Sequence, residues 1–396
     1  MSARRELVAL LVLALVALAL TSVAGIAGAI ALVPIVLVAG GVAHWHGHRA
    51  AQPPTSTVRD DLTGLPLRAS LASEVAGFIA GRSNPDEQLT LHLFDLVGFK
   101  KYNDAYGFAA GDALLRHLSQ RLIASVGHRC DVYRLRGAQF ALLSTEPVGE
   151  RHQLRAQTAT HLREAGEGFL IECAAATVVI PRQAHDLSEA LKLADHELQA
   201  ERGTLKRKGV DEGAITSSTA NRLQSSPYEV ADLASAVSQF LGLDHDEIEV
   251  VHASITWRDV GMMALPESIL LSDGPLSDDA WRFVKLHTLV GERLLRSNFG
   301  LHRVAGVVRS SHERWDGGGY PDGLAGHDIP IVARIVFVCS AFEDMTSPRP
   351  HRRALSATQA LEELRRNAGG QFDPHVVAAF SNAFAERPAT PATRVS

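Results

Sequence analysis

The sequence is poor in cysteine and carries no excess of positive charge. Three cysteines occur among its 396 residues, Cys130, Cys173 and Cys339, and no two of them form a CxxC pair. Such wide spacing excludes a disulfide framework and a structural zinc site, and it is typical of a reducing compartment. The formal net charge is -5. The chain therefore has no polybasic footprint, and nucleic acid is not expected as a partner.

Charged residues are also missing between Glu6 and His44. A helix that crosses a membrane needs about 20 apolar residues, so this stretch is long enough for almost two, joined by a turn at the segment SVAGIAGA. We therefore predict a transmembrane helical hairpin. Arg4 precedes it and Arg49 follows it, and positive charge on both flanks predicts that both ends lie in the cytoplasm. The expected location is the inner (cytoplasmic) membrane. The alternative is a signal peptide cleaved near AGIAGA.

The patterns that follow predict two domains of different class. Strand-like runs at 89–96, 139–145 and 171–181 alternate with helical runs, which is typical of an α/β layer fold. Beyond a second polar linker only helical periods occur, which predicts an all-α domain. The predicted fold class is multidomain, in this order: transmembrane hairpin 1–48, linker 49–60, α/β domain 61–208, linker 209–227, all-α domain 228–388 and disordered tail 389–396.

Three motifs follow one another in the α/β domain: DDLTGLP (60–66), FDLVGFKKYND (94–104) and GFAAGDALL (107–115). Together they resemble the GGDEF family of diguanylate cyclases. The resemblance implies that Asp95 binds magnesium with GTP, and that Asn103 and Asp112 bind the guanine base. An amide and a carboxylate suit guanine, which offers N–H donors and a carbonyl acceptor along one edge.

The hairpin that gives this family its name is altered. Its Gly-Gly-Asp-Glu-Phe stretch reads Arg136, Gly137, Ala138, Gln139 and Phe140. Condensation of two GTP molecules needs carboxylates that hold divalent metal at the triphosphate, and neither Ala nor Gln supplies one. A lysine of the family, near the end of the domain, is Arg202 here. We therefore expect no cyclase activity. Asp95, Asn103 and Asp112 either still bind GTP or are surface and turn residues of an inherited fold.

The all-α domain contains the glycine-rich stretch HERWDGGGYPDGLAGHDIP (312–330). With PESILLSDGPLSDDAW (266–281), ARIVFVCSAFEDMTSPRPHR (333–352) and QFDP (371–374), it resembles the HD-GYP family of cyclic-di-GMP phosphodiesterases. These enzymes use iron or manganese ions that clamp a hydroxide and the phosphate oxygens. The resemblance implies a ligand-binding loop with these residues: Glu313, Trp315, Asp316, Gly319, Tyr320, Pro321, Arg349 and Arg352.

Most metal-binding positions implied by this resemblance are replaced. The changed positions are Arg258, Met262, Ser311 and Ser340, and the retained candidate ligands are Asp259, His287 and His312. Arginine stays protonated and cannot ligate a metal. Three ligands can hold one manganese or iron ion but not a two-metal clamp.

Two alternatives concern single residues of this set. His287 lies on the apolar face of a helix predicted from Ser277 to Leu294, where a histidine can simply be a core residue. Asp344, one helical turn beyond Ser340, or His252, two turns before Asp259, could complete the ligand set. Glu343 stands where the family has another Asp.

Three functions remain open. The favoured one is a non-catalytic receptor or scaffold in cyclic-di-GMP signalling that binds cyclic di-GMP or GTP and needs no cofactor. The second is a metal-dependent phosphohydrolase with residual cyclic-di-GMP phosphodiesterase activity. The third is an interaction platform that binds no nucleotide and pairs as a homodimer or with other signalling proteins. Nucleotide binding without turnover would favour the receptor or scaffold. Bound metal in stoichiometric amount would favour the phosphohydrolase, and the absence of both results would favour the interaction platform.

Overall fold

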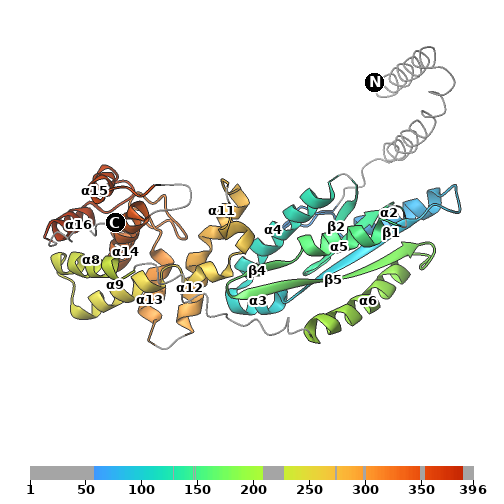
Figure 1. Ribbon diagram of the computed structural model, residues 1–396, viewed down its shortest axis with the longest axis horizontal. Helices are drawn as coiled ribbons and strands as arrows, with labels where there is room; N and C mark the ends of the chain where they lie inside the picture. The colour runs from blue at the N-terminus through green and yellow to red at the C-terminus, as the bar shows by residue number, and fades with distance from the viewer. Residues whose placement is uncertain are drawn as a thin grey trace, which may run out of the picture. The chain divides into compact units, whose positions relative to one another are not determined.

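The computed structural model of the chain (Figure 1) describes residues 58–127, 129–145, 147, 149–207, 227–272, 274–297, 300–347 and 353–386. All of these residues fall within one of the two units into which the chain divides, Val58–Ser396. The predicted hairpin, the tail, most of the second linker, Arg349 and Arg352 lie outside the described residues.

A five-stranded sheet forms the α/β domain, with the strand order β2-β3-β1-β5-β4 and antiparallel pairing throughout. The strands are β1 (Leu89–Val97), β2 (Asp131–Arg136), β3 (Gln139–Ser144), β4 (Glu164–Gly166) and β5 (Phe169–Ile180). The predicted runs correspond to β1, β3 and β5. The central strand β1 is buried along its whole length, because helices cover both faces of the sheet.

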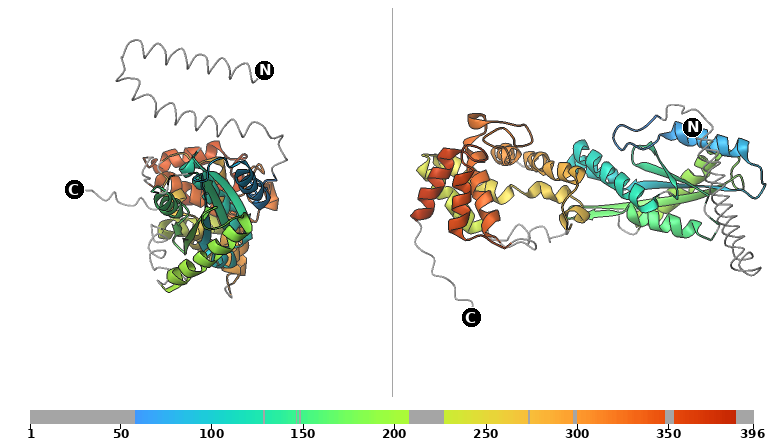
Figure 2. Two further views of the ribbon diagram at one scale, coloured as in Figure 1. Left: turned by 90° about the vertical axis from the view of Figure 1, so that its right-hand side faces the viewer. Right: turned by 90° about the horizontal axis from the view of Figure 1, so that it is seen from above.

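Helices pack on the two faces of this sheet (Figures 1 and 2). The helices are α2 (Arg68–Gly81), α3 (Phe99–Tyr106), α4 (Phe108–Val126), α5 (Arg151–His161) and α6 (Leu187–Arg207). Successive side chains of β1 point to opposite faces of the sheet, because the side-chain period of a strand is two residues. Leu91 packs in the cluster with α2 and α6, whereas Phe94 packs in the cluster with α3, α4 and α5.

The described part of the chain after residue 226 is helical, in agreement with the all-α prediction. Its elements are α8 (Pro227–Phe240), α9 (His245–Trp257), η1 (Val260–Ala264), α10 (Glu267–Leu270), α11 (Asp278–Lys285), α12 (His287–Arg296), α13 (His302–Ser310), η2 (Gly326–Asp328), α14 (Ile331–Thr346), α15 (Ala357–Arg366) and α16 (Pro374–Ala385). Several begin with a side-chain cap: Asp244 and Ser356 each form a capping box.

The helix predicted from Ser277 to Leu294 is two helices in the structure. Ser277 caps α11 as expected, with its Oγ 3.2 Å from the Ala280 nitrogen. The helix then tightens, because the Leu286 nitrogen donates to the Phe283 carbonyl three residues back. The chain restarts as α12 at His287. This break places His287 at the beginning of a helix rather than within one.

The hydrophobic cores do not follow the predicted domain boundary. One cluster of buried residues joins α3, α4 and the sheet with Ala264, Leu265, Ile269, Phe283 and Val284 of the helical part. A second cluster lies among α8, α9, α14, α15 and α16. The segment from η1 to α11 therefore shares its core with the α/β domain.

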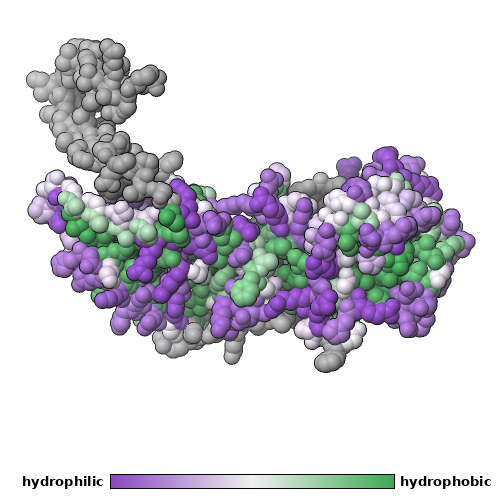
Figure 3. All heavy atoms as spheres, turned by 180° about the vertical axis from the view of Figure 1, so that it is seen from behind, coloured by the Kyte–Doolittle hydropathy of each residue, from purple (hydrophilic) through white to green (hydrophobic). Residues whose placement is uncertain are grey.

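The predicted fold class was wrong in including a transmembrane hairpin. Across the described residues, no helix has both the length and the apolar character that crossing a membrane requires. The helices there bury one face and expose polar residues on the other, and the face drawn in Figure 3 shows hydrophilic and hydrophobic side chains interleaved. Residues 1–48 lie outside the described part, and the expected location stays a prediction.

Candidate metal and nucleotide sites

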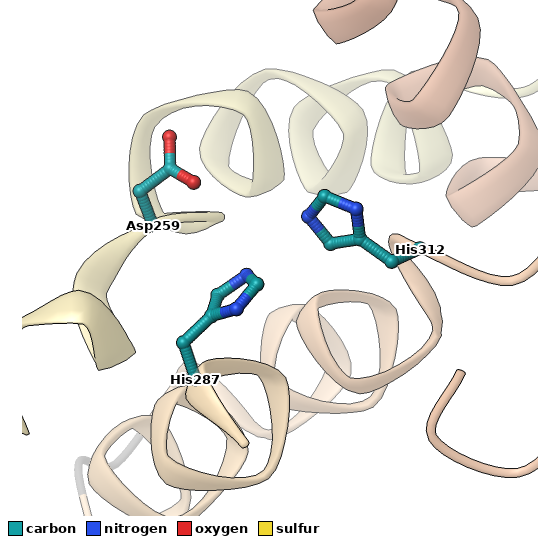
Figure 4. Close-up of side chains that lie close together, drawn as sticks. All are labelled: Asp259, His287 and His312. Atoms are coloured by element: carbon teal, nitrogen blue, oxygen red, sulfur yellow. The ribbon is translucent and has the colours of Figure 1, made fainter. Parts of the chain in front are cut away.

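Asp259, His287 and His312 lie at the ends of three different elements. Asp259 immediately precedes η1, His287 is the first residue of α12, and His312 follows the end of α13. Their side chains point toward one another (Figure 4). One ligand atom from each residue lies within 4.8 Å of the other two. The structure thus brings together the three candidate ligands from distant parts of the sequence.

Both histidines of this triad are held in the neutral form. His287 is 2% exposed, and its Nδ1 lies 2.8 Å from the Val284 carbonyl oxygen, which assigns the ring proton to Nδ1. Its Nε2 is buried without a hydrogen-bond partner among the described residues. Burial lowers the pKa of His287 and, with His287 nearby, lowers the pKa of His312 to about 4. Neutral imidazoles ligate metals, so this donor set fits one divalent ion.

Arg258 forms ion pairs with Asp259 and Glu343, the carboxylates that a second metal ion would need as ligands. Its Nη2 lies 2.7 Å from Glu343 Oε2, and its Nε lies 3.2 Å from Asp259 Oδ2. Its Nη1 also donates to the Ile255 carbonyl at 2.7 Å. Burial raises the pKa of Glu343, although Arg258 opposes that rise. Because one guanidinium already pairs with both carboxylates, the residues do not fit a two-metal cluster.

The other replaced positions add no ligand. Ser311 donates from its Oγ to the Val308 carbonyl at 2.8 Å, and Ser340 Oγ is buried without a partner in the described part of the chain. Met262 packs against the core shared with the α/β domain. Neither Asp344 nor His252 belongs to the group of ligand atoms around Asp259.

Glu313 organises the glycine-rich loop. The residue is 2% exposed. Its carboxylate accepts backbone hydrogen bonds from Asp322 at 2.7 Å and from Gly323 and Leu324 at 3.1 Å. Gly319 has to be glycine, because an added Cβ would lie 2.3 Å from the Arg314 nitrogen. Glu313 therefore holds together the loop that follows His312.

Replacement of Glu313 by alanine should lower the free energy of unfolding by about 2 kcal/mol, because three backbone donors lose an ionised acceptor. Urea unfolding of the full-length protein measures this change. Glu362→Ala is the matched control, since Glu362 is exposed on α15, and it should leave stability within about 0.5 kcal/mol. Equal stability of the two variants would contradict the role assigned to Glu313.

Tyr320 lies over the triad from the same loop. Its ring stacks on His312 with 5.0 Å between the ring centroids, and its nitrogen donates to the His312 carbonyl at 3.2 Å. Lys285 Nζ lies 5.4 Å from the Tyr320 ring centroid, a cation–π distance. The peptide bond between Tyr320 and Pro321 is cis. Lys285, which the sequence analysis did not single out, thus places a positive charge near the triad.

Trp315 and Asp316 stabilise the outer part of the loop. The nitrogens of both residues donate to backbone carbonyls, of Gln371 at 3.1 Å and of Gly370 at 2.9 Å. The Arg314 guanidinium lowers the pKa of Asp316 to about 2, with help from the Gly318 N–H. These contacts join the loop to the segment before α16, so both residues serve the loop's own structure.

An ion pair occupies the implied magnesium position of the α/β domain. Asp95 on β1 pairs with Arg202 on α6. Its neighbour across the β1–β3 ladder is Gln139, and Ala138 is the other residue that replaces an acid. Since the only carboxylate of this set is already neutralised by a guanidinium, these residues do not fit a magnesium ion.

The two implied guanine-binding residues lie on neighbouring helices, Asn103 on α3 and Asp112 on α4. Asn103 Oδ1 is buried without a hydrogen-bond partner among the described residues. An added Cβ on Gly111 would lie 1.7 Å from that oxygen. The Asn103 amide can therefore lie against α4 only because residue 111 is glycine. Asp112 is exposed. A buried acceptor without a donor suits a ligand that brings an N–H group.

The altered hairpin keeps its shape without its acids. Gly137 turns the chain with a φ of 52°, and Phe140 is fully buried. Arg136 Nε donates to Gln139 Oε1 at 2.9 Å. The hairpin is therefore a structural part of the sheet whose polar side chains satisfy each other.

The two arginine pairings were not predicted from the sequence. One signal in the sequence points to the pair of Arg258 and Glu343. Arg258 stands where the HD-GYP family has a histidine, and Glu343 stands where it has an aspartate, so a base and a longer acid replace two residues of one implied site. No comparable signal links Arg202 with Asp95, because the two residues belong to separate motifs.

Family models match both domains. Residues 57–208 match the model described as diguanylate cyclase, GGDEF domain, and residues 209–376 match the model described as HD domain.

Curated relatives match part of the chain. The cyclic di-GMP phosphodiesterase response regulator RpfG of Xanthomonas campestris is 36% identical over 150 residues, which are 37% of this chain and 40% of that protein. A cyclic di-GMP phosphodiesterase of Thermotoga maritima is 33% identical over 37% of this chain and 41% of that protein. A 3'3'-cGAMP-specific phosphodiesterase 2 of Vibrio cholerae is 33% identical over 37% of this chain and 29% of that protein. The chain thus spans well under half the length of these relatives. It carries a GGDEF domain followed by an HD domain whose homologues are named cyclic-dinucleotide phosphodiesterases.

Proposed function

We propose that this chain is a non-catalytic receptor or scaffold in cyclic-di-GMP signalling. The observation that carries the proposal is the bridge from Arg258 to Asp259 and Glu343, at 3.2 and 2.7 Å. Hydrolysis of a phosphodiester by two ions requires ligands for both, so that attacking and leaving oxygens are stabilised together. The tethered guanidinium supplies a permanent positive charge there but cannot activate water.

The HD domain keeps groups that suit a phosphodiester ligand. Lys285 contributes a cation beside Tyr320, and Tyr320 offers an aromatic face next to His312. Neutral His312 can donate or accept a hydrogen bond, whereas His287, whose Nδ1 proton is donated to Val284, can only accept one at Nε2. These residues would orient a cyclic dinucleotide without breaking it. In the GGDEF domain, the unpaired Asn103 Oδ1 would accept a hydrogen bond from a guanine N–H without magnesium.

A second function is favoured by the triad itself. The buried and unpaired His287 Nε2 and the spacing of the ligand atoms within 4.8 Å suit one ion held by Asp259, His287 and His312. When bound, such an ion would polarise a phosphate oxygen. The alternative is therefore a phosphohydrolase with residual activity on cyclic di-GMP. Under either function, pairing of the protein as a homodimer is part of the proposal.

Turnover and binding of cyclic di-GMP separate these functions. The full-length protein is incubated anaerobically with Mn(II) or Fe(II) and cyclic di-GMP, linear product is followed by chromatography, and affinity is measured by calorimetry. We expect binding without linear product. Turnover that Asp259→Ala abolishes would establish the phosphohydrolase instead, and absence of both binding and turnover would leave the interaction platform. Asp232→Ala is the matched control, because Asp232 is an exposed carboxylate on α8.

A further inference from the structure

Tyr102 of the GGDEF domain is hydrogen-bonded to the short helix that follows the ligand Asp259. Its ring lies on α3 and is 2% exposed. Its hydroxyl donates to the carbonyl oxygen of Ala264 at 2.7 Å. Burial raises the pKa of Tyr102 far above its usual value, so the hydroxyl stays protonated and remains a donor. Ala264 is the last residue of η1, and Asp259 directly precedes the first.

The second ligand is attached to the same surface of the GGDEF domain. Phe283 and Val284 at the end of α11 are buried in the core shared with α3 and α4. The carbonyl of Val284 fixes the His287 ring at 2.8 Å. Further along α12, the Arg293 side chain donates to the carbonyls of Asp104 at 3.1 Å and of Ala105 at 3.3 Å, at the end of α3. Both ends of the segment that carries His287 are thus held by the GGDEF domain.

The third ligand belongs to the other core. His312 contacts Phe337 of α14 with 6.0 Å between the ring centroids, and Phe337 packs against the cluster of α8, α9 and α14 to α16. The segments that carry Asp259 and His287 therefore adjoin the core shared with the GGDEF domain, whereas His312 contacts the other core. Between them, a small cluster joins η1, α12 and α13 and consists of Val260, Leu295, Val304, Ala305 and Val308. The spacing of the triad therefore depends on this local packing and on the contacts that the GGDEF domain makes with η1 and α12.

We propose that the GGDEF domain acts as a positioning support for the HD triad, with Tyr102 as the positioning residue that fixes η1 and thereby Asp259. Two measurements test this inference. Only the second, the affinity for Mn(II), depends on the proposal that the triad binds a metal ion. The connection between Ala264 and Asp259 is short. Ala264, which carries the hydrogen-bonded carbonyl, is the fifth and last residue of η1, and Asp259 directly precedes the first. The i to i+3 hydrogen bonds of this 3-10 helix, from Met262 to Asp259 and from Leu265 to Met262, link the two ends. A shift of Ala264 is therefore transmitted to Asp259.

The test compares Tyr102→Phe with Tyr106→Phe in the full-length protein. Tyr106 lies on the same helix and in the same aromatic cluster, with its ring centroid 4.9 Å from that of Tyr102, but its hydroxyl makes no hydrogen bond to any described residue of η1. The first measurement is amide hydrogen exchange without metal. We expect exchange of residues 260–264 to become roughly tenfold faster in Tyr102→Phe, as loss of one hydrogen bond implies, with no change in Tyr106→Phe or in α16.

The second measurement is Mn(II) affinity by calorimetry, which should fall roughly tenfold in Tyr102→Phe only. Unchanged exchange in η1 of Tyr102→Phe would overturn the inference, and so would faster exchange spread evenly over the chain, which indicates a general loss of stability. If the wild-type protein binds no Mn(II), the single-ion function fails, while the exchange measurement still decides the role of Tyr102.

Discussion

Replacement of Arg258 by glutamine should strengthen the binding of Mn(II) about 100-fold. In the wild-type chain, the guanidinium lies 3.2 Å from Asp259 Oδ2, so it competes with any cation for that carboxylate. Asp259 is half-exposed, so an effective dielectric constant of about 40 applies, and a divalent ion and a unit charge about 5 Å apart then repel each other by about 3 kcal/mol. The glutamine removes this repulsion and frees Asp259. Calorimetric titration of the full-length protein with Mn(II) measures the change.

Arg258→Lys is the matched control, because lysine keeps the positive charge and loses only the planar fork. Its affinity for Mn(II) should stay within about threefold of the wild-type value. Arg258→Gln should also lower the free energy of unfolding by about 3 kcal/mol, since Glu343 loses its partner in a buried site. If Arg258→Gln and the wild-type protein bind Mn(II) equally, the guanidinium does not compete with the metal.

Acidification from pH 6.5 to pH 4 should destabilise the protein by about 3 kcal/mol through His92. His92 is fully buried in β1, with its Nδ1 2.9 Å from Thr177 Oγ1. Burial lowers its pKa to about 4, and Arg155 and Arg151 contribute. The unfolded chain takes up a proton near pH 6.5 that the folded protein refuses until about pH 4. The unfolded state therefore binds more protons in this window, and stability falls as the pH falls.

Urea unfolding at several pH values between 7 and 4 tests this linkage. His92→Phe removes the titrating group and should flatten the stability profile in that window. His196→Gln is the matched control, because His196 is exposed on α6, and it should keep the wild-type slope. A profile of His92→Phe as steep as that of the wild-type protein would show that other groups cause the acid sensitivity.

Local patterns in the sequence determined most of the secondary structure, and the resemblance to the HD-GYP family implied the candidate ligands. The apolar run at 89–96 corresponds to β1, and Ser277 caps α11 as a residue of its type should. The family motifs implied Asp259, His287 and His312 as ligands, and the structure brings these three to one place. The strands and helix starts are readable because periodicity, capping and turns depend on residues within one or two turns of the chain.

Only the tertiary structure decided how these parts meet. Arg258 and Glu343 are 85 residues apart, and although both replacements fall in one implied site, the sequence does not show that the two side chains pair. The break before His287 and the core that joins η1 and α11 to α3 were equally hidden, because an apolar stripe shows that a face is buried but not what covers it. The sequence, through its resemblance to a known family, therefore indicated which candidate ligands remain in the HD domain. Packing determined that the Arg258 guanidinium pairs with Glu343, where a second ion would need a ligand. These two residues are distant in the sequence, and they meet only because the packing of the helices brings them together.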